Sequence, residues 1–388
     1  MKDTYISEAV KYIGADDTTL DLFESQYQIP NGVSYNSYVI LDEKVAVMDT
    51  IDERKTDEWF ANLENVLNGR TVDYLVISHL EPDHAANIKR AADKFQKAQL
   101  VLSAKAKAML PQFFDIAHLD ERCLVVKEGD TLELGIHKLH FVMAPMVHWP
   151  EVMVEYEETE KILFSADGFG KFGALSAEEE WTDEARRYFI NIVGKYGVQV
   201  QTLLKKAAAL DIQTICPLHG PVLKENLGFY IGKYLTWSSY EPEEDGVLVA
   251  CASIHGNTKA AAEKMVEVLR ANGASKVVFM DLTRDDMAEA VADAFRYGKI
   301  ILAAASYDAG VFPPMEDFLH RLVHKNLQKR TFGLIENGSW APCAAKGMKG
   351  ILEGMKEVNI CENVVSIKST MKDTDVAKME ELAKEILA

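Results

Sequence analysis

Two different patterns of apolar and polar positions divide this chain. In its first part, short apolar runs separated by polar turns predict strands, and helical spacing predicts helices between some of them. The predicted strands cover residues 38–41, 45–49, 72–78, 139–143, 152–156, 162–165 and 212–216. The predicted helices cover residues 84–95, 178–194 and 200–210. Residues 42–44 separate the first two strands and predict a hairpin.

In the second part, strands and helices alternate strictly. Strands are predicted at 247–252, 277–281, 300–304, 331–335 and 363–367, and helices at 258–271, 287–297, 315–323, 345–355 and 373–387. Such alternation is typical of a parallel, doubly wound sheet. The polar stretch 237–245, which contains Pro242, is the predicted linker. We therefore expect two α/β domains, at residues 1–244 and 245–388.

Length and charge narrow the possible functions. The 388 residues exceed what one hydrophobic core usually organises. A net charge of −18 disfavours nucleic acid and anionic membranes as partners. The sequence contains no apolar run long enough to span a bilayer, and its start lacks the apolar segment of a signal peptide. We therefore expect a cytoplasmic protein.

Metal-ligand side chains gather directly after the apolar run 72–78. His79, Glu81, Asp83 and His84 fall within six residues. Burying two imidazoles and two carboxylates side by side is costly without a cation. Further candidates follow later strands: His148, Asp167 and His219. If the strand ends converge, seven ligands exceed the needs of one tetrahedral zinc and imply two metals, with Asp167 as a candidate bridge.

The ligand types limit the metal. The five cysteines are scattered without a CxxC pair, which disfavours iron–sulfur clusters and a disulfide framework. Imidazole and carboxylate without thiolate suit iron, zinc or manganese, and the high share of carboxylate favours iron. An isolated histidine is more often a core or surface residue, and we interpret the following five in that way: His118, His137, His140, His320 and His324.

Three loops of the second part could hold a flavin phosphate and ring. The loop 253–258 lies between a strand and a helix, where backbone N–H groups face a phosphate, although an ordinary helix N-cap would have the same residues. It matches neither GxxxxGK[ST] nor GxGxxG. Two further loops follow predicted strands, at the edge where ligands bind in open α/β sheets. The candidate FMN contacts are Ser253, His255, Gly256, Asn257, Thr258, Ser306, Tyr307, Asp308, Ala309, Gly310, Asn337, Gly338 and Trp340.

The series His79-x-Glu81-x-Asp83-His84, His148, Asp167 and His219 resembles the metallo-β-lactamase fold and, more narrowly, the flavodiiron proteins. Zinc hydrolases of this fold usually carry HxHxDH, and Glu81 replaces their second histidine. The resemblance extends over essentially the whole chain, including residues 30–38. It implies a metallo-β-lactamase-like αββα sandwich followed by a flavodoxin-like doubly wound parallel sheet. It also implies that His79, Glu81 and His148 hold one iron, that Asp83, His84 and His219 hold the other, and that Asp167 bridges them.

The same resemblance implies reduction of O2 to water, of NO to N2O, or of both, at two non-haem irons. Electrons would reach the irons through FMN from a rubredoxin-like donor, in a head-to-tail homodimer or a dimer of dimers. The alternatives are a zinc-dependent hydrolase fused to a flavodoxin domain and a non-catalytic electron carrier. Three positions depart from the family: His255, where Thr is commoner; Ser306-Tyr307-Asp308, where Thr-Tyr-Asn is commoner; and Glu24, where some members have a histidine and to which we assign no role.

Overall fold

The computed structural model describes residues 5–388 as two compact units. The first unit contains the residues up to 189 together with 198–235, and the second contains 190–197 and 236–388. Residues 1–4, where the expectation about the start of the chain falls, lie outside the described residues.

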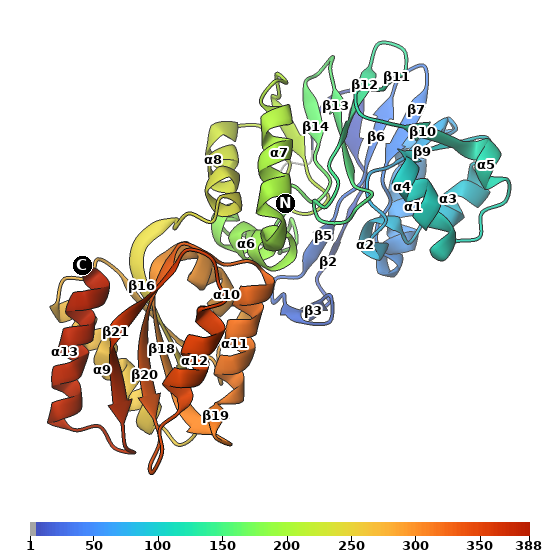
Figure 1. The fold of residues 1–388 in the computed structure, drawn as a ribbon. Helices are drawn as coiled ribbons and strands as arrows, with labels where there is room; N and C mark the ends of the chain where they lie inside the picture. Colours follow the sequence, from blue (N-terminus) through green and yellow to red (C-terminus); the bar gives the residue numbers. More distant parts are fainter. Residues whose placement is uncertain (1–4) are drawn as a thin grey trace. The chain divides into compact units, whose positions relative to one another are not determined.

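The first unit is built on two sheets (Figure 1). One has the order β1 (Val10–Tyr12), β6 (Tyr38–Leu41), β7 (Val45–Met48), β8 (Tyr74–Ile77), β9 (Gln99–Ser103) and β10 (Cys123–Val126). The other has the order β11 (Thr131–Glu133), β12 (Lys138–Met143), β13 (Met153–Glu157), β14 (Ile162–Phe164) and β15 (Thr214–Cys216). Two short pairs accompany them, β2 (Ala15–Asp17) with β5 (Val33–Tyr35) and β3 (Leu22–Phe23) with β4 (Tyr27–Gln28).

The two sheets share one apolar core. Tyr38, Met48 and Val76 of the first sheet pack in one cluster with Phe141 and Phe164 of the second. Helices cover the outer faces (Figure 1): α1 (Thr56–Leu67), α2 (Pro82–Ala85), α3 (Ile88–Lys94), α4 (Ala104–Met109) and α5 (Leu119–Arg122) on one side, and α6 (Trp181–Tyr188), α7 (Gly197–Ala207) and α8 (Leu227–Ser238) on the other. This is the predicted αββα sandwich.

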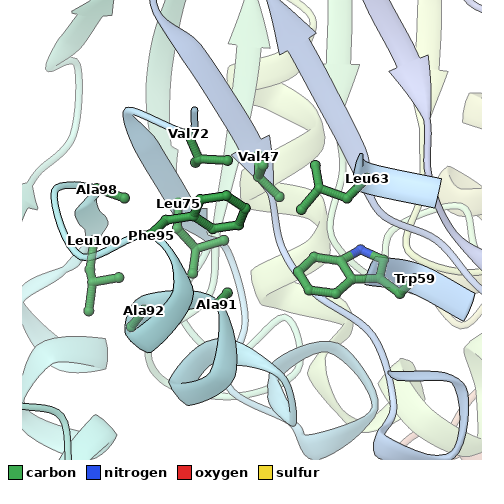
Figure 2. Close-up of a pocket in the computed structure, with 10 residues that line it drawn as sticks. All are labelled: Val47, Trp59, Leu63, Val72, Leu75, Ala91, Ala92, Phe95, Ala98 and Leu100. Carbon is green, nitrogen blue, oxygen red and sulfur yellow. The ribbon is translucent and has the colours of Figure 1, made fainter. Parts of the chain in front are cut away.

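Figure 2 shows how the first helical layer attaches to its sheet. Trp59 and Leu63 of α1 and Ala91 of α3 face Val47 and Leu75 of the sheet. All five side chains are buried. Trp59 and Leu63 are four residues apart on α1, so one face of this helix supplies its contact.

The second unit is a parallel sheet with the order β17 (Val277–Asp281), β16 (Glu244–Ala252), β18 (Tyr297–Tyr307), β20 (Arg330–Asn337) and β21 (Val358–Ile367). The short β19 (Gly310–Val311) pairs with β18 antiparallel. Helices α9 (Asn257–Ala271) and α13 (Asp373–Leu387) cover one face, and α10 (Met287–Arg296), α11 (Pro313–His324) and α12 (Ala344–Leu352) the other (Figure 1). Counted within this unit, the strand order is 2-1-3-4-5, as in flavodoxins. The predicted doubly wound parallel sheet is confirmed.

Some predicted elements have other limits. The stretch 237–245, interpreted as a linker, is the end of α8, a short turn and the start of β16. Helix α8 was not predicted, because its apolar residues are spread around the helix and do not form one apolar face. The predicted helix 178–194 is α6 followed by one π-helical turn, Phe189–Val193.

Candidate metal centre and flavin loops

The seven predicted metal-ligand residues form two neighbouring groups. The first contains His79, Glu81, His148 and Asp167, and the second contains Asp83, His84 and His219. Within each group the possible ligand atoms lie within 4.8 Å of one another. Six of the seven side chains are buried, and only Glu81 is partly exposed.

Asp167 connects the two groups. Its Oδ2 lies 3.4 Å from His79 Nε2 and 3.2 Å from His148 Nε2. Its Oδ1 lies 3.1 Å from His84 Nε2 and 3.8 Å from His219 Nε2. Each oxygen therefore faces a different group, which is the arrangement that a bridge between two cations requires.

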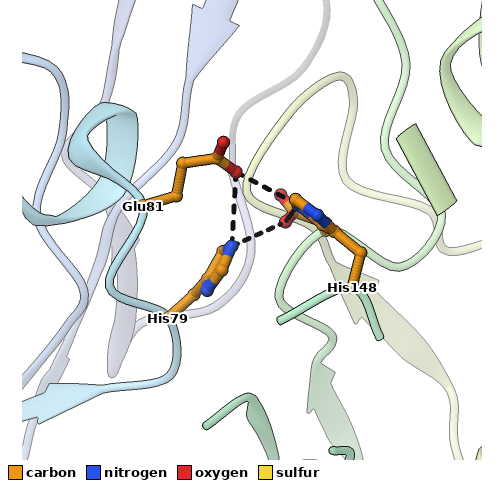
Figure 3. A group of neighbouring side chains, drawn as sticks. His79, Glu81 and His148 are labelled. Atoms are coloured by element: carbon orange, nitrogen blue, oxygen red, sulfur yellow. Dashed lines mark hydrogen bonds and ion pairs between the residues drawn. The ribbon is translucent and has the colours of Figure 1, made fainter. Parts of the chain in front are cut away.

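One further carboxylate completes each group. Glu81 Oε2 lies 3.3 Å from His79 Nε2 and 3.0 Å from His148 Nε2 (Figure 3). Asp83 Oδ2 lies 3.4 Å from His84 Nε2 and 3.1 Å from His219 Nε2. Two imidazoles and two carboxylate oxygens thus converge in each group.

Several of these buried atoms have no hydrogen-bond partner among the residues that the structure describes. They are both carboxylate oxygens of Asp83, Asp167 Oδ2, His148 Nε2 and His219 Nε2. Buried polar atoms are normally paired, because an unpaired one loses its hydration without compensation. Acceptor atoms clustered in this way fit bound cations, and the set of nitrogen and oxygen donors suits iron.

The chain brings these ligands together where strands end. Strand β8 ends at Ile77, and Pro82 then starts α2, so residues 78–81 turn sharply at the end of the sheet. Asp49 Oδ1 accepts a hydrogen bond of 2.7 Å from Ser78 N, which fixes the start of this turn. Asp167 follows β14, and His219 follows its parallel neighbour β15.

Two orienting partners were missed from the sequence. Buried Glu151 Oε1 lies 2.8 Å from His79 Nδ1, and the carbonyl oxygen of Ser34 lies 2.7 Å from His219 Nδ1. When each Nδ1 donates, each Nε2 offers its lone pair to the group. Sequence offered little indication, because Ser34 acts through its backbone and Glu151 differs from the chain's other glutamates only by its nearness to His148.

Protons and carboxylates share this cluster when no cation is bound. Burial opposes protonation of His84, but the carboxylates of Asp83 and Asp167 outweigh it and raise the His84 pKa to about 9. Burial is likewise outweighed at His148 by the neighbouring carboxylates of Asp167 and Glu81, which raise its pKa to about 9. The same imidazoles hold the pKa of Asp167 well below its usual value despite burial. Without a cation, protons on the imidazoles thus balance the charge of the carboxylates, and a bound metal ion would replace those protons.

Glu24, to which no role was assigned, lies in the turn between β3 and β4. Its φ is 47°, in the left-handed region. Partial loss of hydration and the charge of Glu81 raise its pKa.

The three predicted flavin loops lie at the carboxyl ends of β16, β18 and β20, which are adjacent in the sheet. Ser306 and Tyr307 are the last two residues of β18, and Asn337 is the last of β20. Gly256, with φ of 94°, precedes the first residue of α9 and donates from its N–H to Ser253 Oγ at 3.1 Å. His255 and Asn257 are exposed and Thr258 is buried. Helix α9 therefore begins at Asn257 with its N-terminus beside this loop, which suits a phosphate.

Some side chains of the other two loops are engaged within the protein. Ser306 Oγ accepts hydrogen bonds from Cys343 N and Ala344 N at the start of α12. Asn337 pairs with the backbone of Ser369 through both ends of its amide. Asp308 and Ala309 form a turn with positive φ that leads into Gly310. Tyr307 and Trp340 remain exposed, Trp340 by 89%.

The other predicted residues behave as ordinary side chains. His137 lies 2.8 Å from Asp42, His140 2.6 Å from Glu158 and His118 3.0 Å from Glu121, while His320 and His324 stack on α11. All five cysteines are free thiols. Within residues 5–388, no helix is long and apolar enough to cross a membrane.

Comparison with known proteins gives consistent matches over the whole chain. Residues 33–220 match the family model described as "ODP family beta lactamase". The nitric oxide reductase of Moorella thermoacetica is 26% identical over 99% of this chain and 98% of its own. The solved rubredoxin oxygen:oxidoreductase of Desulfovibrio gigas superposes with a TM-score of 0.91 at 26% identity, covering 99% of this chain and 97% of its own. A variant of the flavo di-iron protein of Thermotoga maritima has the same fold, with a TM-score of 0.89 at 22% identity over 100% of this chain and 98% of its own.

Proposed function

We propose that this chain, a member of the flavodiiron protein family, is an oxidoreductase that reduces O2 to water, NO to N2O, or both. The observation that carries the proposal is the position of Asp167, with one carboxylate oxygen toward each group of ligands. Relatives of similar length are named for each of the two reactions.

The residues that we propose as iron ligands are those of the two groups. His79, Glu81 and His148 would hold one iron, and Asp83, His84 and His219 the other, with Asp167 between them. Bound iron would supply electrons to the diatomic substrate. The protein's own contribution is to fix the imidazoles through Glu151 and the Ser34 carbonyl, so that the ligand set persists when the metal changes its charge.

We place FMN at the carboxyl ends of β16, β18 and β20. The loop 253–258 and the N-terminus of α9 would hold the phosphate, with Tyr307 and Trp340 beside the ring. Ser306 and Asn337 would act by shaping the loops, because their side chains bond to Cys343, Ala344 and Ser369. The remaining candidate contacts are Asp308 and Ala309, which are exposed, and Gly310 and Gly338, which are partly exposed.

Three further proposals concern organisation. We propose a domain boundary at residues 244 and 245, a rubredoxin-like electron donor, and a cytoplasmic location. We also propose a head-to-tail homodimer, or a dimer of such dimers, in which FMN of one chain meets the irons of the other. A monomer in solution with full activity would exclude that assembly.

The test is anaerobic kinetics on protein with measured iron and FMN. We expect two irons and one FMN per chain, and consumption of O2 or NO when a reduced rubredoxin is the donor. Two bound zinc ions with hydrolytic activity would instead support a hydrolase. Reduced, fully loaded protein that reacts with neither gas would support an electron carrier.

A further inference from the structure

An apolar cavity lies inside the first unit, between the second sheet and α7. Val142 and Val154 on paired strands and Leu163 on β14 form its floor. Leu203, Leu204 and Ala207 of α7 lie opposite. The volume open to the centre of a water-sized molecule is about 30 Å³. Roughly 10–15 Å³ of such volume is enough to hold one water.

The polar groups that border the cavity are engaged with the backbone. Ser165 Oγ donates to the carbonyl of Gly168 at 2.7 Å, and Tyr234 OH accepts from the N–H of Phe169. The rings of Phe169 and Tyr234 are stacked with centroids 4.2 Å apart. A water molecule inside would find few of the polar partners that it needs.

Residues that line this cavity are neighbours in the chain of residues of the metal centre. Ser165, Gly168 and Phe169 line the cavity, and Asp167 lies among them. The N–H of Gly168 bonds to the carbonyl of Ser165 at 2.9 Å, which closes a tight turn around Asp167. Val147, the residue before His148, lines the cavity as well. Two of the four residues in the first ligand group therefore adjoin cavity-lining residues in the chain.

We propose that this cavity is a holding site for a small apolar gas beside the metal centre. Gas binding follows from the size and apolar lining of the cavity. Its role as a reservoir for O2 or NO rests on the proposed function. Both gases are nearly apolar diatomic molecules that partition from water into apolar surroundings, so an apolar cavity near the ligands would raise their local concentration.

Xenon tests the binding site without any catalysis. Crystals of the iron- and FMN-loaded protein are pressurised with xenon and compared with untreated crystals. We expect xenon density between β14 and α7, none in Ala207→Phe, whose ring fills the cavity, and more in Leu204→Ala, which enlarges it. Ala208→Phe is the matched control, because Ala208 is exposed and does not line the cavity. The absence of xenon from both the parent protein and Leu204→Ala would overturn the proposal.

Kinetics test the role. We expect Ala207→Phe to raise KM for the gas several-fold with kcat, iron and FMN content unchanged, and Ala208→Phe to leave all four unchanged. If Ala207→Phe excludes xenon but leaves KM unchanged, the cavity is a packing defect and the reservoir is refuted. If the parent protein binds xenon but reduces neither gas, the proposed function fails while the gas site stands.

Discussion

Glu151 offers a sharp test of how the metal centre is built. Its side chain is almost fully buried, at 1% exposure, and Oε1 faces His79 Nδ1 at 2.8 Å and accepts from Leu80 N at 3.0 Å. Burial disfavours its charge, but the hydrogen bond with His79 outweighs this and lowers the Glu151 pKa. An ionised Glu151 therefore holds the proton of His79 on Nδ1 and directs Nε2 toward Glu81 and Asp167.

Two substitutions separate the charge from the hydrogen bond. Glu151→Gln keeps an acceptor oxygen of the same shape and removes the charge, whereas Glu151→Ala removes both. Loss of such an orienting partner typically weakens metal binding about 10- to 100-fold. We expect Glu151→Gln to weaken iron binding about 10-fold, or about 1.4 kcal/mol, and Glu151→Ala to weaken it about 100-fold, or about 2.7 kcal/mol.

The assay is retention of iron against a competing chelator, with iron counted per chain at each chelator concentration. Glu158→Gln is the control, since Glu158 also lies beside a histidine, His140 at 2.6 Å, but in the solvent-exposed β12–β13 region. One iron should be lost early from the Glu151 variants, and the second should be retained as in the parent protein. Iron retention in Glu151→Ala equal to that in Glu158→Gln would refute the orienting role.

Three other predictions concern pH and stability. Because the pKa values of His84 and His148 are about 9 without metal, both must lose a proton when iron binds. The apparent affinity for iron should therefore rise from pH 7 to 9, by up to about tenfold per pH unit for each displaced proton. Titration calorimetry in buffers of different ionisation enthalpy should detect the released protons. Asp17, buried against Arg54 Nε at 2.6 Å, has a pKa lowered to about 2 because hydrogen bonds from Arg54 and Thr19 outweigh its burial. The ion pair of Asp17 with Arg54 thus stabilises the fold fully above about pH 4, and this contribution is lost as the pH falls toward 2. Asp17→Asn should lower the free energy of unfolding by about 1–2 kcal/mol at pH 7, after allowing for the exposed Arg54. If the variant is still less stable than the parent protein in urea unfolding at pH 2, the ion pair is not the cause. Leu63→Ala, in the helix–sheet contact of Figure 2, should cost about 2–5 kcal/mol, whereas Ile136→Ala, at a side chain 75% exposed, should leave the urea midpoint nearly unchanged.

The sequence by itself determined the local part of this protein. Period-two and period-3.6 patterns indicated most strands and helices of the second unit within a few residues, because each element buries one face. The cluster from His79 to His84 was recognisable because it places four metal-ligand side chains within six residues after a strand, and burying them without a cation is costly. Helix α8 was missed because its apolar residues do not follow one stripe.

Only the tertiary structure decided which atoms meet. Glu151 lies 72 residues from His79 and Ser34 lies 185 residues from His219, and no local pattern encodes a contact at such separations. The division of Asp167 between two groups depends on the orientation of one carboxylate, which the surrounding packing sets. Asn337 illustrates the same limit, since its amide was available for a ligand in sequence but bonds to Ser369 in the fold. Sequence fixes which side chains can do chemistry, whereas long-range packing decides which of their atoms are left free to do it.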